Sequence, residues 1–251
     1  MTCGRGGACP VSASDLIFDA AHPIHVRTAH QQQTFLSCGK TIPVEVFTPA
    51  AAGRHAALVV LHGSGGYRDF SKLAQNIASH GYAVLAPQYF ESTGTAWASG
   101  SEIAQHALTW AAVVQDAVSF AAQQSFVDPD RIALIGFSLG AYLAIGVAAQ
   151  NERIKAVVEF FGGLPGPLAA FIQRLPPTLI LHGEADAVVP LREGRRLEQL
   201  CRARNICVET ETYPGVGHHF PPAIMERAMQ RALSFLDQHL SPVQQKTKQP
   251  A

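Results

Sequence analysis

The sequence predicts an α/β fold with a mostly parallel central sheet flanked by helices. Continuous apolar runs, such as A-A-L-V-V-L at 56–61, are typical of strands buried on both faces. They alternate with stretches in which apolar residues recur at helical spacing, a pattern typical of right-handed βαβ units with parallel strands. The 251 residues, of which 47% are hydrophobic and 15% charged, suffice for one sizeable core.

The predicted elements begin after an N-terminal arm or lead-in at 1–32. Two apolar runs between residues 33 and 49, on either side of Gly39-Lys40, predict a β-hairpin. After the strand at 56–61, Asp69 is expected to cap a helix that ends at Gly81.

The remainder of the chain repeats this alternation. Asp128-Pro129-Asp130 predicts a turn before the strand that leads to Ser138. Further strands are expected at 83–86, 132–135, 156–160, 178–182 and 207–212, and further helices at 102–123, 138–150, 192–204 and 221–239. Together with the hairpin these elements form one domain at 33–240, and a polar tail follows at 241–251.

Composition excludes several classes of function. The formal net charge is zero and no basic patch stands out, so a nucleic-acid partner is not expected. No stretch approaches about 18 consecutive apolar residues and no secretory signal is visible, which predicts a cytoplasmic protein without a membrane partner. The five cysteines include no C-x-x-C pair and the histidines no H-E-x-x-H. We therefore expect free thiols, no metal site and no cofactor.

The candidate chemistry lies just after four strands. Ligands of open parallel sheets bind at the carboxyl ends of the strands. The segments that follow those ends are H-G-S-G-G at 62–66, G-F-S-L-G at 136–140, G-E-A-D at 183–186 and Y-P-G-V-G-H-H-F at 213–220. They deliver a glycine-rich loop, a serine, an acid and a histidine, which is the set that acyl transfer requires.

Ser138 is the candidate nucleophile. A G-x-S-x-G match can arise by chance, but here an apolar strand precedes it and a helix-like stretch follows. Gly136 and Gly140 would let this turn close against its neighbours without Cβ clashes, and the helix N-terminus adds a positive potential near the hydroxyl. The alternative is a turn serine that merely caps a helix.

The acid and the base each have a rival. Asp186 is favoured over Glu184 because it precedes A-V-V-P at 187–190, which can pack and fix the loop, although Asp186 can also be a helix or loop cap. His218 and His219 lie between glycines and an aromatic residue, and a loop position suits a base that must reach a serine. Either histidine can equally be a solvated loop residue. The order Ser, Asp, His is the one expected on this fold.

The sequence resembles the α/β-hydrolase superfamily and, within it, the dienelactone hydrolase-like family, over residues 34 to 240. The stretches that carry the resemblance are L-H-G-S-G-G (61–66), D-P-D-R-I-A-L-I-G-F-S-L-G (128–140), L-H-G-E-A-D-A-V-V-P (181–190) and Y-P-G-V-G-H-H-F (213–220). The resemblance implies that 33–240 is an α/β-hydrolase catalytic domain without a large cap domain.

The resemblance also implies a role for each site residue. Ser138 would be the nucleophile and Asp186 the acid. His218 would be the base, since the family's histidine precedes one residue and then an aromatic, as His218 does in H-H-F. The oxyanion hole would consist of the backbone amide of Leu139 and one from Ser64 or Gly65.

Two departures from the family bear on the substrate. The namesake enzymes use a cysteine where this chain has Ser138, and they grip a substrate carboxylate with arginines that the loops 87–95 and 218–224 lack. We therefore expect a neutral, small-molecule ester or lactone as substrate. Because the segment 161–177 is too short for a large cap, the site should accept small or medium substrates.

Aromatic residues at or beyond strand ends are candidates for the substrate pocket, although aromatics in α/β proteins often belong to the core. These candidates are Tyr89, Phe90, Trp97, Phe160 and Phe161. The machinery predicts a carboxylic ester hydrolase that works through an acyl-enzyme. A small serine peptidase, an acyltransferase or a lipase would share it, and the fold can also serve as a non-catalytic binding protein.

Overall fold

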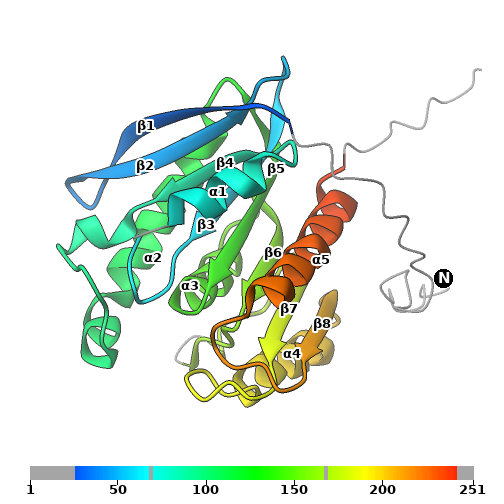
Figure 1. The fold of residues 1–251 in the computed structure, drawn as a ribbon. Coiled ribbons are helices and arrows are strands. Elements are labelled where there is room, and N and C mark those ends of the chain that lie inside the picture. The colour runs from blue at the N-terminus through cyan, green and yellow to red at the C-terminus, as the bar shows by residue number, and fades with distance from the viewer. Residues whose placement is uncertain (1–25, 68–69, 167–168, 242–251) are drawn as a thin grey trace, which may run out of the picture.

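The computed structural model describes residues 26–67, 70–166 and 169–241 (Figure 1). The strands are β1 (Thr28–Ser37), β2 (Lys40–Pro49), β3 (His55–Leu61), β4 (Ala83–Pro87), β5 (Val127–Phe137), β6 (Ile154–Phe160), β7 (Thr178–Gly183) and β8 (Val208–Tyr213). The helices are α1 (Phe70–Ala78), the short 3-10 helix η1 (Tyr89–Ser92), α2 (Gly100–Ala122), α3 (Leu139–Ala148), α4 (Arg192–Ala203) and α5 (Pro222–Leu240). None of these described helices is long and apolar enough to cross a bilayer.

All eight strands form one sheet in the order β1-β2-β4-β3-β5-β6-β7-β8. The hairpin strands β1 and β2 run antiparallel at one edge, and β2 pairs antiparallel with β4. From β4 to β8 every neighbouring pair is parallel. The predicted fold class, a mostly parallel sheet flanked by helices, is confirmed (Figure 1). The carboxyl ends of β3, β5, β7 and β8 consequently share one edge.

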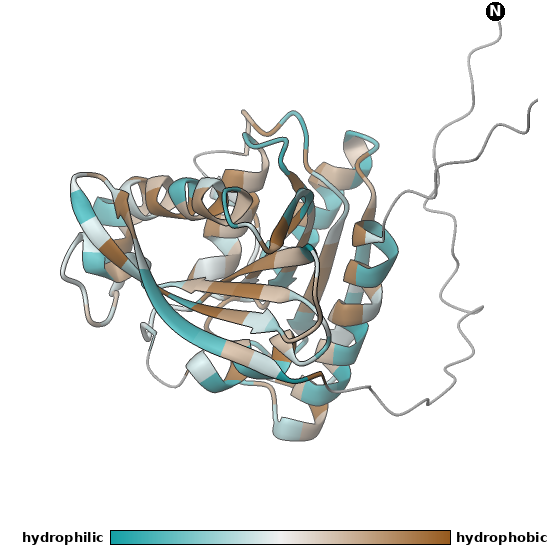
Figure 2. Ribbon diagram, turned by 90° about the horizontal axis from the view of Figure 1, so that it is seen from above, coloured by the Kyte–Doolittle hydropathy of each residue, from teal (hydrophilic) through white to brown (hydrophobic). Residues whose placement is uncertain are grey.

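Helices cover both faces of the sheet, and each face has its own apolar layer. Leu58 and Val60 of β3 pack in the layer that contains α1 and α5, whereas Val59 and Leu61 pack in the layer that contains α2, α3 and α4. Successive side chains of a strand point to opposite faces, so a strand covered on both sides must be apolar throughout. In Figure 2 hydrophobic residues accordingly follow the central strands.

The predicted hairpin is present, with its turn one residue earlier than expected. Ser37 pairs with Lys40, so Cys38 and Gly39 form a two-residue loop, with φ of 51° and 73°. Positive φ at both positions is the geometry that matches the twist of a hairpin. Strand β1 begins at Thr28, inside the range predicted as arm or lead-in, while residues 1–25 and 242–251 lie outside the described residues.

Two other predicted details differ or are not described. The predicted turn at 128–130 lies within β5, but the ladder is interrupted there: His55 pairs with Val127 and Ala57 with Ile132. The intervening residues bulge from the sheet, and the Asp130 amide donates to the Asp128 carboxylate as in a turn. The predicted cap Asp69 lies outside the described residues.

Candidate active site

The structure brings the predicted serine, histidine and acid together. Ser138 directly follows β5, Asp186 lies in the loop after β7, and His218 lies in the loop after β8. His218 Nε2 is 3.0 Å from Ser138 Oγ, and His218 Nδ1 is 2.8 Å from Asp186 Oδ2. Because a carboxylate only accepts, Nδ1 carries the hydrogen, and Nε2 of the neutral imidazole then accepts from the Ser138 hydroxyl.

Ser138 occupies a strained turn. It is the single residue between β5 and α3, with φ of 52° and ψ of −116°. A non-glycine residue in such a conformation costs roughly 1–3 kcal/mol and is typical of functional sites. The turn is very close to its neighbours, as the sequence predicts: a Cβ on Gly136 would lie 2.3 Å from the Gly140 oxygen, and one on Gly140 would lie 2.4 Å from the Leu61 oxygen. Only glycine fits at either position.

The loop that carries Asp186 is fixed by its own hydrogen bonds. Asp186 is buried, and its Oδ1 accepts from the backbone amides of Val188 and Val189, each at 2.8 Å. His182 donates through Nε2 to the Val189 carbonyl at 2.8 Å. Burial lowers the pKa of His182, which keeps its ring neutral. Because both backbone amides donate to Oδ1, Oδ2 of Asp186 is the oxygen that faces His218.

The rival residues lie elsewhere. Glu184 is exposed, and its carboxylate accepts from the Thr212 hydroxyl at 2.7 Å. His219 is exposed too, whereas only 10% of the His218 side chain is exposed. The ring of Phe161 packs edge-on against His218, with centroids 4.9 Å apart. The geometry thus favours Asp186 and His218.

The predicted oxyanion loop lies beside the serine. A Cβ on Gly63 would lie 3.4 Å from Ser138 Cβ, which brings this loop against Ser138. Leu139 is the first residue of α3, so its amide has no acceptor within the helix. Ser64 lines the same cavity as Ser138 and Leu139, and its carbonyl accepts from the Ala98 amide at 2.9 Å. Gly65 is exposed and outside that lining.

A largely apolar cavity of about 870 Å³ opens from Ser138. It lies between α2 and α3 and extends to Pro165, Gly166 and the Val188-Val189 pair. Among the described residues that line it, none carries a charge. Sequence reasoning missed this cavity, although α2 carries the signal for it: apolar residues at Ile103, Ala107 and Ala111 form a second stripe beside its buried face.

The aromatic residues predicted for the pocket lie outside this cavity. Tyr89 and Phe90 are buried next to the predicted oxyanion loop, where the Tyr89 ring stacks on His62 with centroids 4.0 Å apart. Phe160 packs on Phe137 in the core, and its carbonyl accepts from the Ser138 amide. None of the five lines this cavity, Phe161 contacts His218 instead, and Trp97 is 60% exposed.

His62 is a structural histidine. Its Nδ1 donates to the Gly63 carbonyl at 2.8 Å, and the Tyr89 hydroxyl donates to the His62 carbonyl at 2.6 Å. Burial lowers the pKa of His62 to about 4, against a smaller opposing effect of the Gly63 hydrogen bond. The ring is therefore uncharged at neutral pH and fixes the start of the glycine-rich loop at 62–66.

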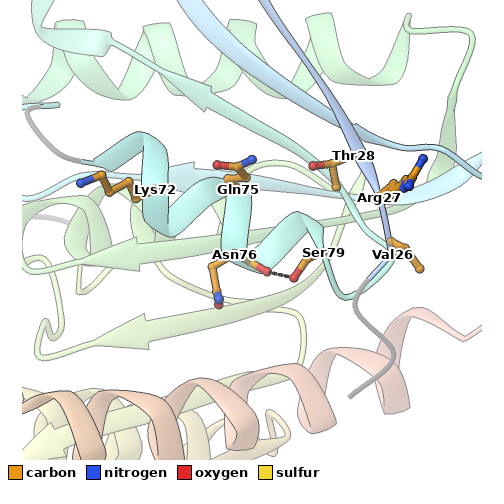
Figure 3. Close-up of a pocket in the computed structure, with 7 residues that line it drawn as sticks. All are labelled: Val26, Arg27, Thr28, Lys72, Gln75, Asn76 and Ser79. Carbon is orange, nitrogen blue, oxygen red and sulfur yellow. Dashed lines mark hydrogen bonds between the residues drawn. The ribbon is translucent and has the colours of Figure 1, made fainter. Parts of the chain in front are cut away.

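A second hollow, of about 540 Å³, lies between the start of β1 and α1 (Figure 3). Its polar lining includes Arg27, Lys72 and Gln75, and the Ser79 hydroxyl donates to the Asn76 carbonyl beside it. None of Ser138, Asp186 and His218 lines this hollow.

A buried carboxyl group lies beneath the serine turn. Glu159 of β6 is fully buried, and its Oε2 accepts from the Gly162 amide at 2.7 Å, while Oε1 has no hydrogen-bond partner among the described residues. Burial raises the pKa of Glu159 to about 8, against a smaller opposing effect of the Gly162 hydrogen bond. The group is consequently protonated in the folded protein at neutral pH.

We expect Glu159→Gln to flatten the pH dependence of stability. In the unfolded chain the carboxyl ionises near its ordinary value of 4.5, so the native state binds the extra proton from there up to about 8. In the wild type, the contribution of protonated Glu159 to the free energy of unfolding is fully present below pH 4.5. It decreases as the pH rises, by about 3 kcal/mol between pH 5 and 8. Urea unfolding of both proteins at pH 5 and pH 8 measures how much the free energy of unfolding changes between the two. An equal change in wild type and Glu159→Gln would contradict the prediction.

Known proteins resemble this chain over most of its length. The family model described as the dienelactone hydrolase family matches residues 42–240. A Yersinia pestis protein provisionally named carboxymethylenebutenolidase is 25% identical, over 88% of this chain and 93% of its own length. A Methylorubrum extorquens protein of the same provisional name is 28% identical, over 71% of this chain and 68% of its own length.

Solved structures share the fold. A provisionally assigned dienelactone hydrolase from Klebsiella pneumoniae superposes with a TM-score of 0.74 at 23% identity, covering 84% of this chain and 99% of that one. An α/β-hydrolase enzyme from a deep-sea metagenome superposes with a TM-score of 0.67 at 16% identity, covering 85% and 99%. The fold is thus that of the α/β hydrolases, and with a family match over residues 42–240 the chain belongs to the dienelactone hydrolase family.

Proposed function

We propose that this chain is a serine hydrolase that cleaves neutral carboxylic esters or lactones of small or medium size through an acyl-enzyme. The observation that carries the proposal is the continuous hydrogen-bonded series from Ser138 through His218 to Asp186. Nucleophile, base and orienting acid follow three parallel strands in the chain order expected for this fold. Family membership supports the same class of reaction.

The first half-reaction follows from the hydrogen-bond directions. His218 Nε2 takes the proton of Ser138 Oγ as the oxygen attacks the carbonyl carbon, and Asp186 stabilises the imidazolium and holds its tautomer. The negative charge on the carbonyl oxygen is stabilised by the Leu139 amide and an amide near Ser64. The C–O bond to the alcohol then breaks, and the alcohol leaves with the proton from His218.

The second half-reaction reverses these roles. Water gives a proton to His218 and attacks the acyl carbon, and collapse of the intermediate returns the proton to Ser138 and frees the acid. The strained backbone conformation of Ser138 holds its hydroxyl at the end of β5, beside His218, in both steps.

The cavity supports a neutral substrate. None of its described lining residues bears a charge, so a substrate carboxylate would find no partner there. The provisional name of the Yersinia pestis and Methylorubrum extorquens relatives, carboxymethylenebutenolidase, supports an ester or lactone as the class of substrate.

We place the enzyme in the cytoplasm. The thiols of Cys38 and Cys201 are free, which suits a reducing compartment. Cys3 and Cys9 lie outside the described residues.

A fluorophosphonate probe tests the proposal. Such probes react with serines activated by a neighbouring base, so we expect one adduct per chain, located on Ser138 by peptide mass spectrometry. Hydrolysis of p-nitrophenyl butyrate should fall in proportion to the labelled fraction. Heat-unfolded protein is the control and should take up no label. Labelling elsewhere, or full activity of a fully labelled protein, would contradict the proposal.

A further inference from the structure

The cavity at Ser138 is longer than a small ester requires. On α2 its lining runs from Ile103 to Gln115, and along α3 it runs from Leu139 to Val147 and on to Gln150, just beyond the end of that helix. At 1.5 Å per residue these stretches span roughly 17 Å along the helices. The cavity is therefore a groove between two helices, one that extends far beyond the reacting atoms.

The groove has its start at the active site. The Ala98 amide, just before α2, donates to the Ser64 carbonyl in the oxyanion loop, and α3 begins directly after Ser138. Both helices thus run away from the site in the same direction, and they lie on the same face of the sheet. The far end of the groove is marked by the amides of Gln115 and Gln150, which are its polar residues at that end.

The walls suit an aliphatic chain. Along α2 the positions Ile103, Ala107 and Ala111 recur every four residues, and the two alanines leave room between the helices. Leu108 and Val188, which also line the groove, are 79% and 68% exposed. Large apolar side chains so exposed in one concave site are typical of a ligand-binding surface.

The groove lies on the acyl side of the reaction. Ser138, Leu139 and Ser64 line it, whereas His218 is not among its described lining residues. The alcohol must depart next to His218, because it takes its proton from that residue. The acyl group stays bonded to Ser138 Oγ through both half-reactions, so it occupies the side that leads away from His218.

We propose that this groove holds an unbranched acyl chain of about eight to twelve carbons, and that esters of medium-chain fatty acids are the preferred substrates. The upper bound is the groove's length: roughly 17 Å at about 1.25 Å per methylene accommodates about thirteen to fourteen carbons. The inference rests on the proposed function and defines its substrate class.

A chain-length series with two groove-filling variants tests the inference. We expect the wild-type kcat/KM for p-nitrophenyl esters to rise at least tenfold from acetate to an optimum between octanoate and dodecanoate, since each buried methylene adds binding energy. Ala111→Phe fills the groove about 12 Å from Ile103 and Ala107→Phe about 6 Å from it. The optimum should move to shorter chains in the first variant and shorter still in the second.

Two comparisons control for misfolding and for the addition of a large ring to α2. Circular dichroism spectra and thermal unfolding midpoints that match the wild type show that both variants are folded, and the readout is the ratio of octanoate to acetate kcat/KM within each variant. Gln105→Phe adds the same ring at an exposed α2 position outside the groove and should leave the series unchanged. The proposal that the groove binds the acyl chain would be refuted if acetate were the best substrate. It would also be refuted if both variants lost kcat/KM equally on every ester. Ser138-dependent acetate hydrolysis would still support the proposed function.

Binding separates the two proposals if no ester is cleaved. Methyl octanoate, a neutral ester, titrated by calorimetry into protein carrying Ser138→Ala, reports on the groove without turnover. We expect binding that Ala107→Phe weakens at least tenfold and Gln105→Phe does not change. That result without any esterase activity would support acyl-chain binding in the groove and refute the proposed function. Absence of binding would refute acyl-chain binding in the groove.

Discussion

Replacing Ser138 by alanine is expected to lower kcat/KM for p-nitrophenyl butyrate by about ten-thousand-fold to a million-fold. In the proposed mechanism the hydroxyl oxygen forms the acyl bond, and among the described residues no other hydroxyl or thiol hydrogen-bonds to His218. The residual rate should reflect the oxyanion hole and substrate binding alone. Initial rates at several substrate concentrations, with active-site titration of the wild type, measure the effect.

The fold should survive this replacement. Alanine at position 138 meets the same backbone strain at φ of 52°, and it leaves Gly136 and Gly140 in their close packing. We expect the free energy of unfolding in urea to change by no more than about 1 kcal/mol, since only one half-buried hydroxyl is lost. Near-full activity in such a folded variant would remove Ser138 from the mechanism.

The strand-end placement of the site was predictable because backbone alone determines it. An apolar run followed by G-F-S-L-G specifies a strand, a tight turn and a helix, and the glycines at 136 and 140 have one physical use there, close backbone approach. Parallel pairing then places the loops after β5, β7 and β8 at one edge. The proximity of serine, acid and histidine follows from that topology.

The pocket was not predictable because it depends on side-chain directions and on helix pairing. Tyr89 and Phe90 do follow a strand end, but a 3-10 helix turns them inward onto His62. The groove instead arises where α2 and α3 lie side by side, and its alanines are unremarkable in sequence. A stripe such as Ile103, Ala107 and Ala111 indicates only an apolar helix face until its neighbour is known.

The burial of an acidic side chain was not predictable from the sequence either. Glu159 lies in a run, A-V-V-E-F, that predicts a fully buried strand, and the structure shows that the strand keeps its acid inside. A single hydrogen bond from Gly162 holds it under the turn that carries Ser138. Sequence patterns specify which face is buried, but they do not specify which buried polar group finds a partner.

Replacing Asp186 by asparagine is expected to lower kcat for p-nitrophenyl butyrate by about ten-thousand-fold while leaving the loop in place. The amide oxygen can still accept from Val188 and Val189, but the amide nitrogen then faces His218 Nδ1 as a donor. That donor selects the tautomer with hydrogen on Nε2, which cannot take the proton of Ser138. KM should change little, since the cavity lining is untouched.

Glu184→Gln is the matched control, because it makes the same chemical change two residues away. The Glu184 carboxylate accepts from the Thr212 hydroxyl on the surface, a contact that the glutamine oxygen preserves. We expect less than a threefold change in kcat. A loss in Glu184→Gln that equals the loss in Asp186→Asn would mean that charge on this loop, rather than the tautomer of His218, supports the rate. A loss confined to Asp186→Asn would show that the rate depends on the tautomer of His218 that carries its hydrogen on Nδ1.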